Sequence, residues 1–456
     1  MKEIIEKLAQ KSPVAVMGHA LLEHVFAPEK IDDIFRQHRI KQRERDWLFS
    51  SIVDLMTVVA CKIKPSIHAA YQEIKDSAPA SLDALYKKLD GIELAVSEAL
   101  VRETARNMKE ILKHVLPENQ EIIPGYRSRI VDGNKLAATD RRLAVQRDQP
   151  AAPLPGFALA IYEPAYSLIT DIILCNDGHT QERKLLPQLA ELVEPDDLWF
   201  ADRNFCCSGY LMEIAQRGGY FVIRQHASTP WEPLEDLVFQ GETETGDVWE
   251  QKGIVTNPVT GQRLEIRRVE IRLKTPTRDG DGEMSLFSNL PESVSALMIA
   301  DSYRKRWWIE TAFQELESLL LGEIQTLCYP PAALFALSTA MVAYNVLQCL
   351  VSSIEVSHPE ETREISAYHV SHAMSQTHVG LCLFSEPSDW EEFRTLDARE
   401  MGRFLLRLGA QVRYDVYAKR PPSKKKPARK STKRKNHTST AKLLKEKKTM
   451  AKILNS

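Results

Sequence analysis

Hydrophobic residues recur at helical spacing through the first quarter of the chain. Ile31, Ile34 and Phe35 form one such group, and Leu48, Ile52 and Leu55 form another, each set between polar residues. Apolar positions three and four apart are typical of an amphipathic helix. The pattern predicts a helical domain over residues 1–120, and on its own it assigns no chemistry to that domain.

The period changes near residue 126, where short apolar runs bounded by turn residues replace the helical spacing. Five of these runs read as strands, and two segments between them keep a helical period. The strands are expected at 129–133, 156–165, 167–177, 197–202 and 220–224, and the helices at 182–193 and 207–218. Adjacent antiparallel strands followed by helix-linked strands predict a mixed sheet flanked by helices, hence an α/β fold.

Residues 226–292 are rich in turn residues and charge, and they read as a β-rich insertion. Within them, 263–273 alternates between apolar and polar residues, but the phase slips by one position at Arg267-Arg268. A β-bulge at that point would explain the slip.

Helices are expected again after the insertion, at 299–320, at 331–354 and on to about residue 410. The segment 331–354 carries no charge and is long enough to span a bilayer. It contains polar residues, Asn345 and Gln348 among them, and its flanks Glu323 and Glu355 are acidic. Because the positive-inside signal is missing, we expect a buried helix of a large core and no membrane partner.

Charge is distributed unevenly along the 456 residues. Residues 418–456 hold 15 lysines and arginines against one acidic residue, so the net charge of −2 conceals an acidic body and a basic tail. The tail, residues 411–456, has little apolar surface and is expected to be disordered and to contact a polyanion. The seven cysteines form no CxxC pair, which argues against a disulfide framework and indicates a reducing, cytoplasmic location.

The helix at 299–320 carries two stripes side by side. At about 100° per residue, Tyr303, Arg306, Glu310 and Glu317 share one arc of about 60°, and an apolar stripe lies directly beside it. Such a helix can pack on a sheet while it holds its polar edge over the rim. A surface helix with an Arg306–Glu310 ion pair is the alternative.

Two aspartates end predicted strands: Asp132 ends the first and Asp202 the fourth. Strand-end carboxylates are often only turn residues. In a mixed sheet of this order, however, the first and fourth strands can be neighbours, so that both aspartates meet Glu310 of the helix. A hard divalent cation, Mg²⁺ or Mn²⁺, would relieve the repulsion among three carboxylates.

These elements carry a resemblance to a known family. RIVDGN at 129–134, WFADRNF at 199–205, FSNLP at 287–291 and the spacing Y-x2-R-x3-E of Tyr303, Arg306 and Glu310 resemble the bacterial DDE transposases of the insertion-sequence-four family. The resemblance covers about 125–350. It implies a ribonuclease H-like core in two parts, 121–225 and 293–410, interrupted by the insertion at 226–292.

The resemblance also implies roles for individual residues. Asp132, Asp202 and Glu310 match the catalytic, metal-binding triad, which would hold two Mg²⁺ (or Mn²⁺) ions. Tyr303 and Arg306 match the residues that contact DNA phosphates, and Arg203, next to Asp202, is a further candidate. The implied activity is cleavage at the ends of an insertion sequence and strand transfer into target DNA. The implied partners are the terminal inverted repeats, which residues 1–120 would bind, the target DNA and a second copy of the chain in a synaptic complex.

One position departs from the family pattern. The family has a lysine seven residues after the glutamate, and this sequence has Glu317 there. The departure keeps two alternatives open, a decayed or repurposed copy that binds DNA without cutting it and a nuclease without strand transfer. Trp231 and Trp249 of the insertion are candidates for stacking on an extruded base, with core packing as the alternative role.

Overall fold

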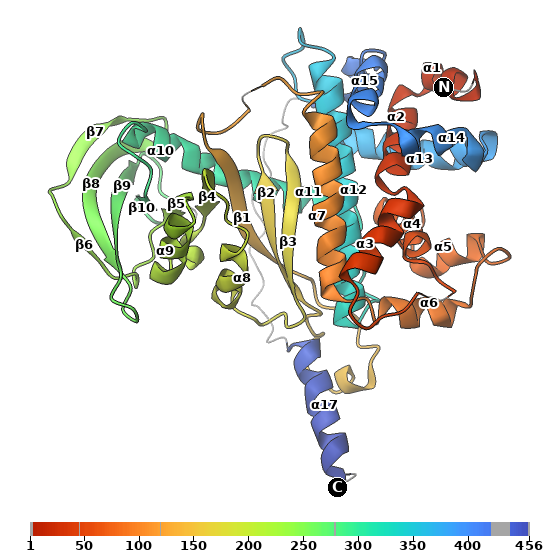
Figure 1. The fold of residues 1–456 in the computed structure, drawn as a ribbon, viewed down its shortest axis with the longest axis horizontal. Coiled ribbons are helices and arrows are strands. Elements are labelled where there is room, and N and C mark those ends of the chain that lie inside the picture. Colours follow the sequence, from red (N-terminus) through yellow and green to blue (C-terminus); the bar gives the residue numbers. More distant parts are fainter. Residues whose placement is uncertain (1–2, 45, 119, 278–279, 421–437, 455–456) are drawn as a thin grey trace.

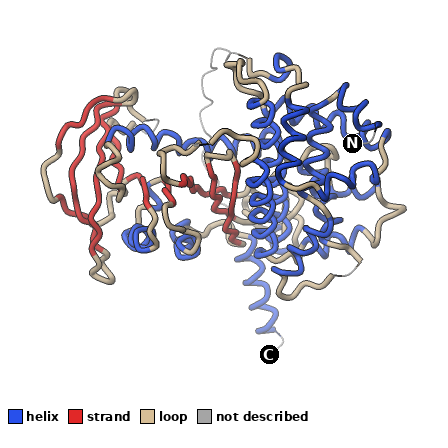
Figure 2. Tube along the Cα trace, turned by 45° about the horizontal axis from the view of Figure 1, so that its top comes forward, coloured by secondary structure: helices blue, strands red, loops and turns tan. Residues whose placement is uncertain are grey.

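The computed structural model describes residues 3–44, 46–118, 120–277, 280–420 and 438–454. Its N-terminal part is helical, as the spacing of apolar residues predicts, and several of these helices pack beside helices that follow the sheet (Figures 1 and 2). The N-terminal helices are α1 (Glu3–Lys11), α2 (Pro13–Val25), α3 (Pro28–His38), α4 (Phe49–Ala60), α5 (Ile67–Glu73), α6 (Leu82–Leu89) and α7 (Leu94–Leu112). Those after the sheet are α10 (Ala296–Tyr303), α11 (Trp307–Leu319), α12 (Pro330–Val356), α13 (Ala367–Phe384), α14 (Pro387–Thr395), α15 (Ala398–Gly409), α16 (Tyr414–Tyr417) and α17 (Thr440–Leu454).

In the described residues, ten strands form one mixed sheet in the order β3-β2-β1-β4-β5-β10-β9-β8-β6, with β7 paired to β8. The first five are β1 (Arg127–Lys135), β2 (Phe157–Glu163), β3 (Leu168–Cys175), β4 (Asp197–Ala201) and β5 (Tyr220–Arg224). All five expected strands are present, and the α/β fold is confirmed. The remaining strands are β6 (Trp231–Pro233), β7 (Val238–Glu242), β8 (Gly246–Thr256), β9 (Arg263–Leu273) and β10 (Glu283–Ser288).

Two hydrophobic layers cover the two faces of the sheet. On one face α7 and α12 pack against β3 and join the sheet to the N-terminal helices (Figure 1). On the other face, α8 (Leu186–Ala190) and α9 (Ser208–Gln216) cover Val131, Trp199 and Phe221. Helices on both faces explain why β2 and β4 are buried at every position and read as continuous apolar runs.

The helix α12, which contains the uncharged segment 331–354, is a core helix, as expected. It is the one described helix that is long and apolar enough to cross a membrane, and its most apolar stretch is completely buried inside the protein. Asn345 lies in its middle and is fully buried. Its amide oxygen accepts from Ile169 N at 2.9 Å and its amide nitrogen donates to Ile169 O at 2.8 Å. Asn345 therefore satisfies the open backbone groups of the edge strand β3, which lies against α12.

Asn345→Ala should lower the free energy of unfolding by about 1–3 kcal/mol for each of the two Ile169 groups left without a partner. Urea unfolding followed by circular dichroism would measure the loss. Ser338→Ala in the same helix is the control, since its hydroxyl donates only to Leu334 O of the preceding turn. Equal stability of the two variants would contradict the role assigned to Asn345.

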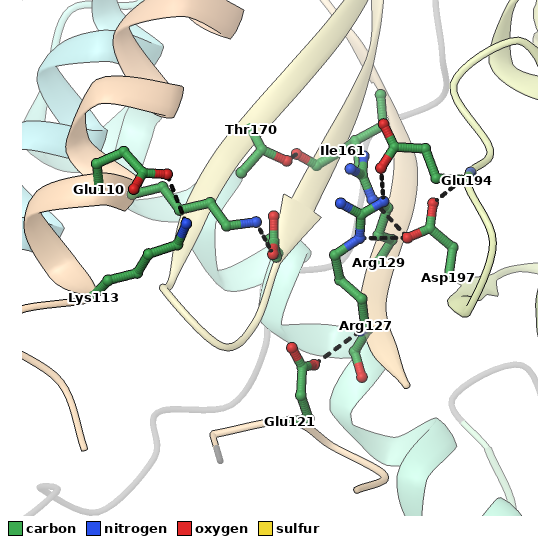
Figure 3. Close-up of polar contacts among 12 residues, drawn as sticks. Glu110, Lys113, Glu121, Arg127, Arg129, Ile161, Thr170, Glu194 and Asp197 are labelled. Atoms are coloured by element: carbon green, nitrogen blue, oxygen red, sulfur yellow. Dashed lines mark hydrogen bonds and ion pairs between the residues drawn. The ribbon is translucent and has the colours of Figure 1, made fainter. Parts of the chain in front are cut away.

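An ionic cluster fixes the beginnings of β1 and β4. The fully buried carboxylate of Asp197 accepts from Arg127 Nε, lies 3.4 Å from Arg129 Nε and also accepts from Glu194 N (Figure 3). Arg127 and Asp197 are also register partners in the parallel pairing of the two strands. The cluster thus aligns β1 with β4 at one end, which determines which residues meet at the other end.

The structure differs from the sequence expectations in the insertion, in the helix at 299–320 and in the tail. In the insertion, the strands extend the main sheet through the pairing of β10 with β5. No bulge interrupts β9, because its pairing with β8 and β10 keeps one register throughout. The phase slip instead reflects a change of buried face, with Ile266 in the layer of α8 and α9 and Val269 in the opposite layer.

The second and third differences concern the helix at 299–320 and the tail. The helix is divided into α10 and α11 by a 3-10 turn at Arg304–Arg306. In the tail, expected to be disordered over 411–456, the structure has the helices α16 and α17, and 421–437 lies outside the described residues. Ser439 and Thr440 are buried, and Thr440 Oγ1 accepts from Gln146 Nε2 at 3.2 Å, so contacts with the core order the start of α17.

Candidate active site

Asp132 and Asp202 lie at the same edge of the sheet on neighbouring parallel strands. Ile130 of β1 is opposite Phe200 of β4, and each aspartate follows two residues later. The carboxyl ends of parallel neighbours meet at one edge, so the expected adjacency of the first and fourth strands is confirmed. Asp202 caps the short turn that follows β4, and its Oδ1 accepts from Asn204 N at 2.8 Å.

Glu310 reaches this edge from α11, which packs against β1. Arg306, the last residue of the 3-10 turn at Arg304–Arg306, lies between the carboxylates of Asp132 and Glu310. Its Nη1 is 3.1 Å from Asp132 Oδ2 and its Nη2 is 2.7 Å from Glu310 Oε1. The Arg306 side chain is 10% exposed, and its Nε has no hydrogen-bond partner among the described residues. The expected Arg306–Glu310 pair is present, and it is part of a buried bridge to Asp132.

The carboxylates influence one another electrostatically. Burial raises the pKa of Asp132 to about 6, while the Arg306 charge and the Gly133 N–H lower it. The charges of Asp202 and Glu310 raise the pKa of Asp132 further, which places both groups within electrostatic reach of it. Asp132 and Glu310 therefore share the Arg306 guanidinium, which neutralises part of their charge, and Asp202 acts on Asp132 through its charge.

The donor set fits a hard divalent cation chemically, since carboxylate oxygens are the ligands that Mg²⁺ and Mn²⁺ prefer. The buried guanidinium between Asp132 and Glu310 shows that this position already holds a positive charge. Within the described ranges, no three His, Cys, Asp or Glu side chains are arranged as they stand to hold a metal ion. At the expected site, the Arg306 guanidinium lies between Asp132 and Glu310, two of the three expected ligands.

Tyr303 and Arg203, the other two expected phosphate contacts, flank the carboxylates differently. Tyr303 is buried, its hydroxyl donates to Ala201 O at 3.2 Å, and its ring lies 6.0 Å from the Arg306 guanidinium. Tyr303 thus ties the end of α10 to β4 next to Asp202. Arg203 is exposed, and its side chain has no polar partner in the part of the chain that the structure describes.

The two tryptophans of the insertion are not brought to the carboxylates. Trp249 is on β8, which β5, β10 and β9 separate from β4, and Trp231 is on β6 beyond it. Trp231 packs against Phe287 and below Arg268, and Trp249 packs against Phe239 and below Arg272. In this structure both rings serve packing within the insertion.

A fourth acid lies at the same edge and was not expected from the sequence. Glu182 accepts from Asn204 Nδ2 at 3.1 Å, and its pKa is raised by burial and then by the charge of Asp202. A Cβ at Gly133 would lie 2.5 Å from Glu182 Oε1 and 2.8 Å from the Phe157 ring, so glycine permits this close approach. The sequence signal was only an acidic residue at a helix start, which is common in any protein.

The carboxylates at this edge lie within a segment that matches a known protein family. Among curated proteins, none matches the sequence. A solved structure, the cryo-EM structure of a piggyBac transposase synaptic complex with hairpin DNA, matches with 9% identity over 83% of this chain and 82% of that chain, at a TM-score of 0.37. The family model described as Transposase DDE domain matches residues 125–346, which include all three carboxylates, and this match supports a DDE transposase as the class of protein.

Proposed function

We propose that the chain is a metal-dependent DNA transposase of the insertion-sequence-four type, which cleaves the ends of its element and joins them to target DNA. One observation carries the proposal. Asp132 and Glu310 share the buried Arg306 guanidinium, and the charge of Asp202 acts on Asp132, all inside the segment that matches a transposase DDE domain. An acidic cluster with a buried arginine at its centre suits a site that must bind both cations and phosphate.

Each residue has a defined part in this proposal. The three carboxylates would hold two Mg²⁺ or Mn²⁺ ions, which supply the charge that activates a water or a 3′-hydroxyl and stabilises the leaving oxygen. Arg306 would release Asp132 and Glu310 and turn to a non-bridging oxygen of the scissile phosphate. Tyr303 keeps α10 against β4 through Ala201 O, and Arg203 offers an exposed charge to the DNA backbone.

The rest of the chain would serve assembly on DNA. In this proposal residues 1–120 bind the terminal inverted repeats, and two copies of the chain hold two ends in a synaptic complex. The protein would act in the cytoplasm of a bacterium, at the nucleoid.

The test is incubation of the protein with end DNA of its own element and Mg²⁺, with products separated on denaturing gels. Nicks at the element ends followed by joined products support transposition. Cleavage without joined products would favour a nuclease, and binding without cleavage would favour a repurposed DNA-binding protein. Glu317, where the family has lysine, is the observation that keeps the second alternative in view.

The basic segment 421–437 gives a separate prediction. Replacing its eight lysines and arginines with glutamine should flatten the slope of log K against log salt for duplex DNA. Each contacted phosphate contributes about −0.9 to that slope, so contacts by a third of the eight charges would change it by roughly 2 units. Binding titrations at several salt concentrations would measure the slope.

The variant leaves Ser439 and Thr440 in place, so the start of α17 stays docked. Discrimination between element ends and random DNA should survive, because phosphate contacts carry little sequence information. A scrambled segment of the same composition is the control and should keep the full slope. Coinciding slopes for all three proteins would mean that the segment does not touch DNA.

A further inference from the structure

A hollow lies directly beyond the carboxylates, between the end of α11 and the chain that leaves β1. Its volume is about 300 Å³. Leu316, Leu320, Leu337 and Phe313 form apolar parts of its wall, and the polar lining comes from Asn134, Gln314, Glu317, Glu323 and Gln325. No lysine, arginine or histidine of the described chain lines it. Ligand pockets span about 300–1,000 Å³, so this volume suits one small ligand.

The hollow is lined by residues further along β1 and α11, on the same faces of these elements that carry Asp132 and Glu310. Asn134 is two residues beyond Asp132 on β1, and therefore on the same face of the strand about 7 Å further on. Glu317 is seven residues beyond Glu310 on α11, two turns or about 10 Å further on. At about 3.4 Å per nucleotide, these distances correspond to two or three nucleotides of a DNA strand that has its phosphate at the carboxylates.

Four of the five polar side chains of the hollow have no polar partner among the residues that the structure describes. Those of Asn134, Gln314, Glu317 and Gln325 make no hydrogen bond or ion pair with any described residue. Glu323 accepts from Ala137 N at 2.9 Å, and its pKa is raised by burial and, to a smaller extent, by the facing charge of Glu317. Two carboxylates and three amides therefore line a space in which they can accept hydrogen bonds from a bound donor.

From this placement we infer that the hollow is a pocket for an unpaired nucleobase of the DNA end, with preference for a base that carries an exocyclic amino group (adenine, cytosine or guanine) over thymine. The inference rests on the proposed function. A groove that holds the DNA backbone would carry cations, and this one carries none. Carboxylates accept from the exocyclic amino group of cytosine or guanine, and asparagine or glutamine amides pair with adenine. The Phe313 ring and the leucines offer the apolar surface on which an unstacked base can lie.

The inference gives Glu317 a function in place of the lysine that the family has. A lysine there would bind phosphates without regard to sequence, whereas Glu317 would select a base that can donate a hydrogen bond from an amino group. The pocket would therefore add sequence preference at the end of the element, two or three nucleotides from the cleaved bond.

The experiment measures binding alone, in EDTA, so that no cleavage occurs. Four otherwise identical duplexes each carry one unpaired nucleotide, A, C, G or T, at the third position from the end, and compete with a duplex that carries an unpaired 2-aminopurine at the same position. We expect the A, C and G duplexes to compete at least fivefold better than the T duplex. We also expect the 2-aminopurine fluorescence to change on binding, and Glu317→Gln combined with Gln314→Ala to remove both effects while leaving the salt slope unchanged.

Glu391→Gln is the matched control, because Glu391 is an exposed glutamate on α14 in the helical part of the chain. It should behave like the unaltered protein. Equal competition by all four duplexes, or a preference that survives the double variant, would overturn the pocket. Since metal ions are absent, a protein that fails to cleave DNA can still show the preference, and a protein that cleaves normally can lack it, so the pocket and the proposed function fail separately.

Discussion

Asp132→Asn, Asp202→Asn and Glu310→Gln should each reduce cleavage of end DNA by roughly 10³-fold or more, as removal of a residue that acts in a catalytic unit does. Each change keeps the shape of the side chain and removes its charge, so a cation loses a ligand while the packing is retained. Affinity for end DNA should change little, because in the proposed function these side chains hold metal ions and do not contact base edges. Gel assays of cleavage and binding titrations in EDTA would give the two quantities separately.

Glu182→Gln is the control within the same edge of the sheet. Glu182 is near Asp202 but contacts Asn204, so its loss should lower cleavage far less than the loss of any triad member. Near-normal cleavage by one of the three triad variants would show that the triad is misassigned. A loss in Glu182→Gln as large as theirs would add a fourth member to the catalytic set.

The positions of the two aspartates could be predicted because they depend on local signals. Buried strands read as apolar runs, and Asp132-Gly133 and Asp202-Arg203-Asn204 mark where two of them end. The order of strands and helices then made the first and fourth strands candidate neighbours, and their pairing confirms it. Such inferences need only the periodicity of the chain and the rules of sheet topology.

The bridge from Arg306 to Asp132 and the 3-10 turn that contains Arg306 could not be predicted, because they depend on contacts between distant parts of the chain. The sequence pattern of 299–320 is that of one continuous helix, yet Tyr303 is held by Ala201 O and Arg306 by Asp132. The 3-10 turn at Arg304–Arg306 accommodates both contacts, since residues three apart eclipse in that geometry. The continuous register of β9 has a similar origin, because its phase slip reflects which helices cover each part of the strand.

Arg306→Ala should have opposite effects on metal binding and on cleavage. In the DNA-free protein the guanidinium and a divalent cation compete for Asp132 and Glu310, so its removal should raise the affinity for Mn²⁺ by about tenfold or more. A tenfold change is about 1.4 kcal/mol, which is well below the roughly 4 kcal/mol between unit charges 4 Å apart at intermediate dielectric. Isothermal titration of the metal-free protein with MnCl₂ would measure it. Cleavage should fall, because the proposed contact with the scissile phosphate is lost.

Arg304→Ala is the control that separates the effect of Arg306 on Mn²⁺ affinity from the loss of any positive charge in the 3-10 turn. Arg304 belongs to the same 3-10 turn, but its Nη1 pairs with Glu244 Oε2 at 2.7 Å, away from the three carboxylates. Its replacement should leave Mn²⁺ affinity unchanged. If Arg306→Ala also left that affinity unchanged, the bridge to Asp132 and Glu310 would not compete with metal. If it raised the affinity and cleavage stayed normal, Arg306 would keep the carboxylates apart until metal binds and would have no contact with the phosphate.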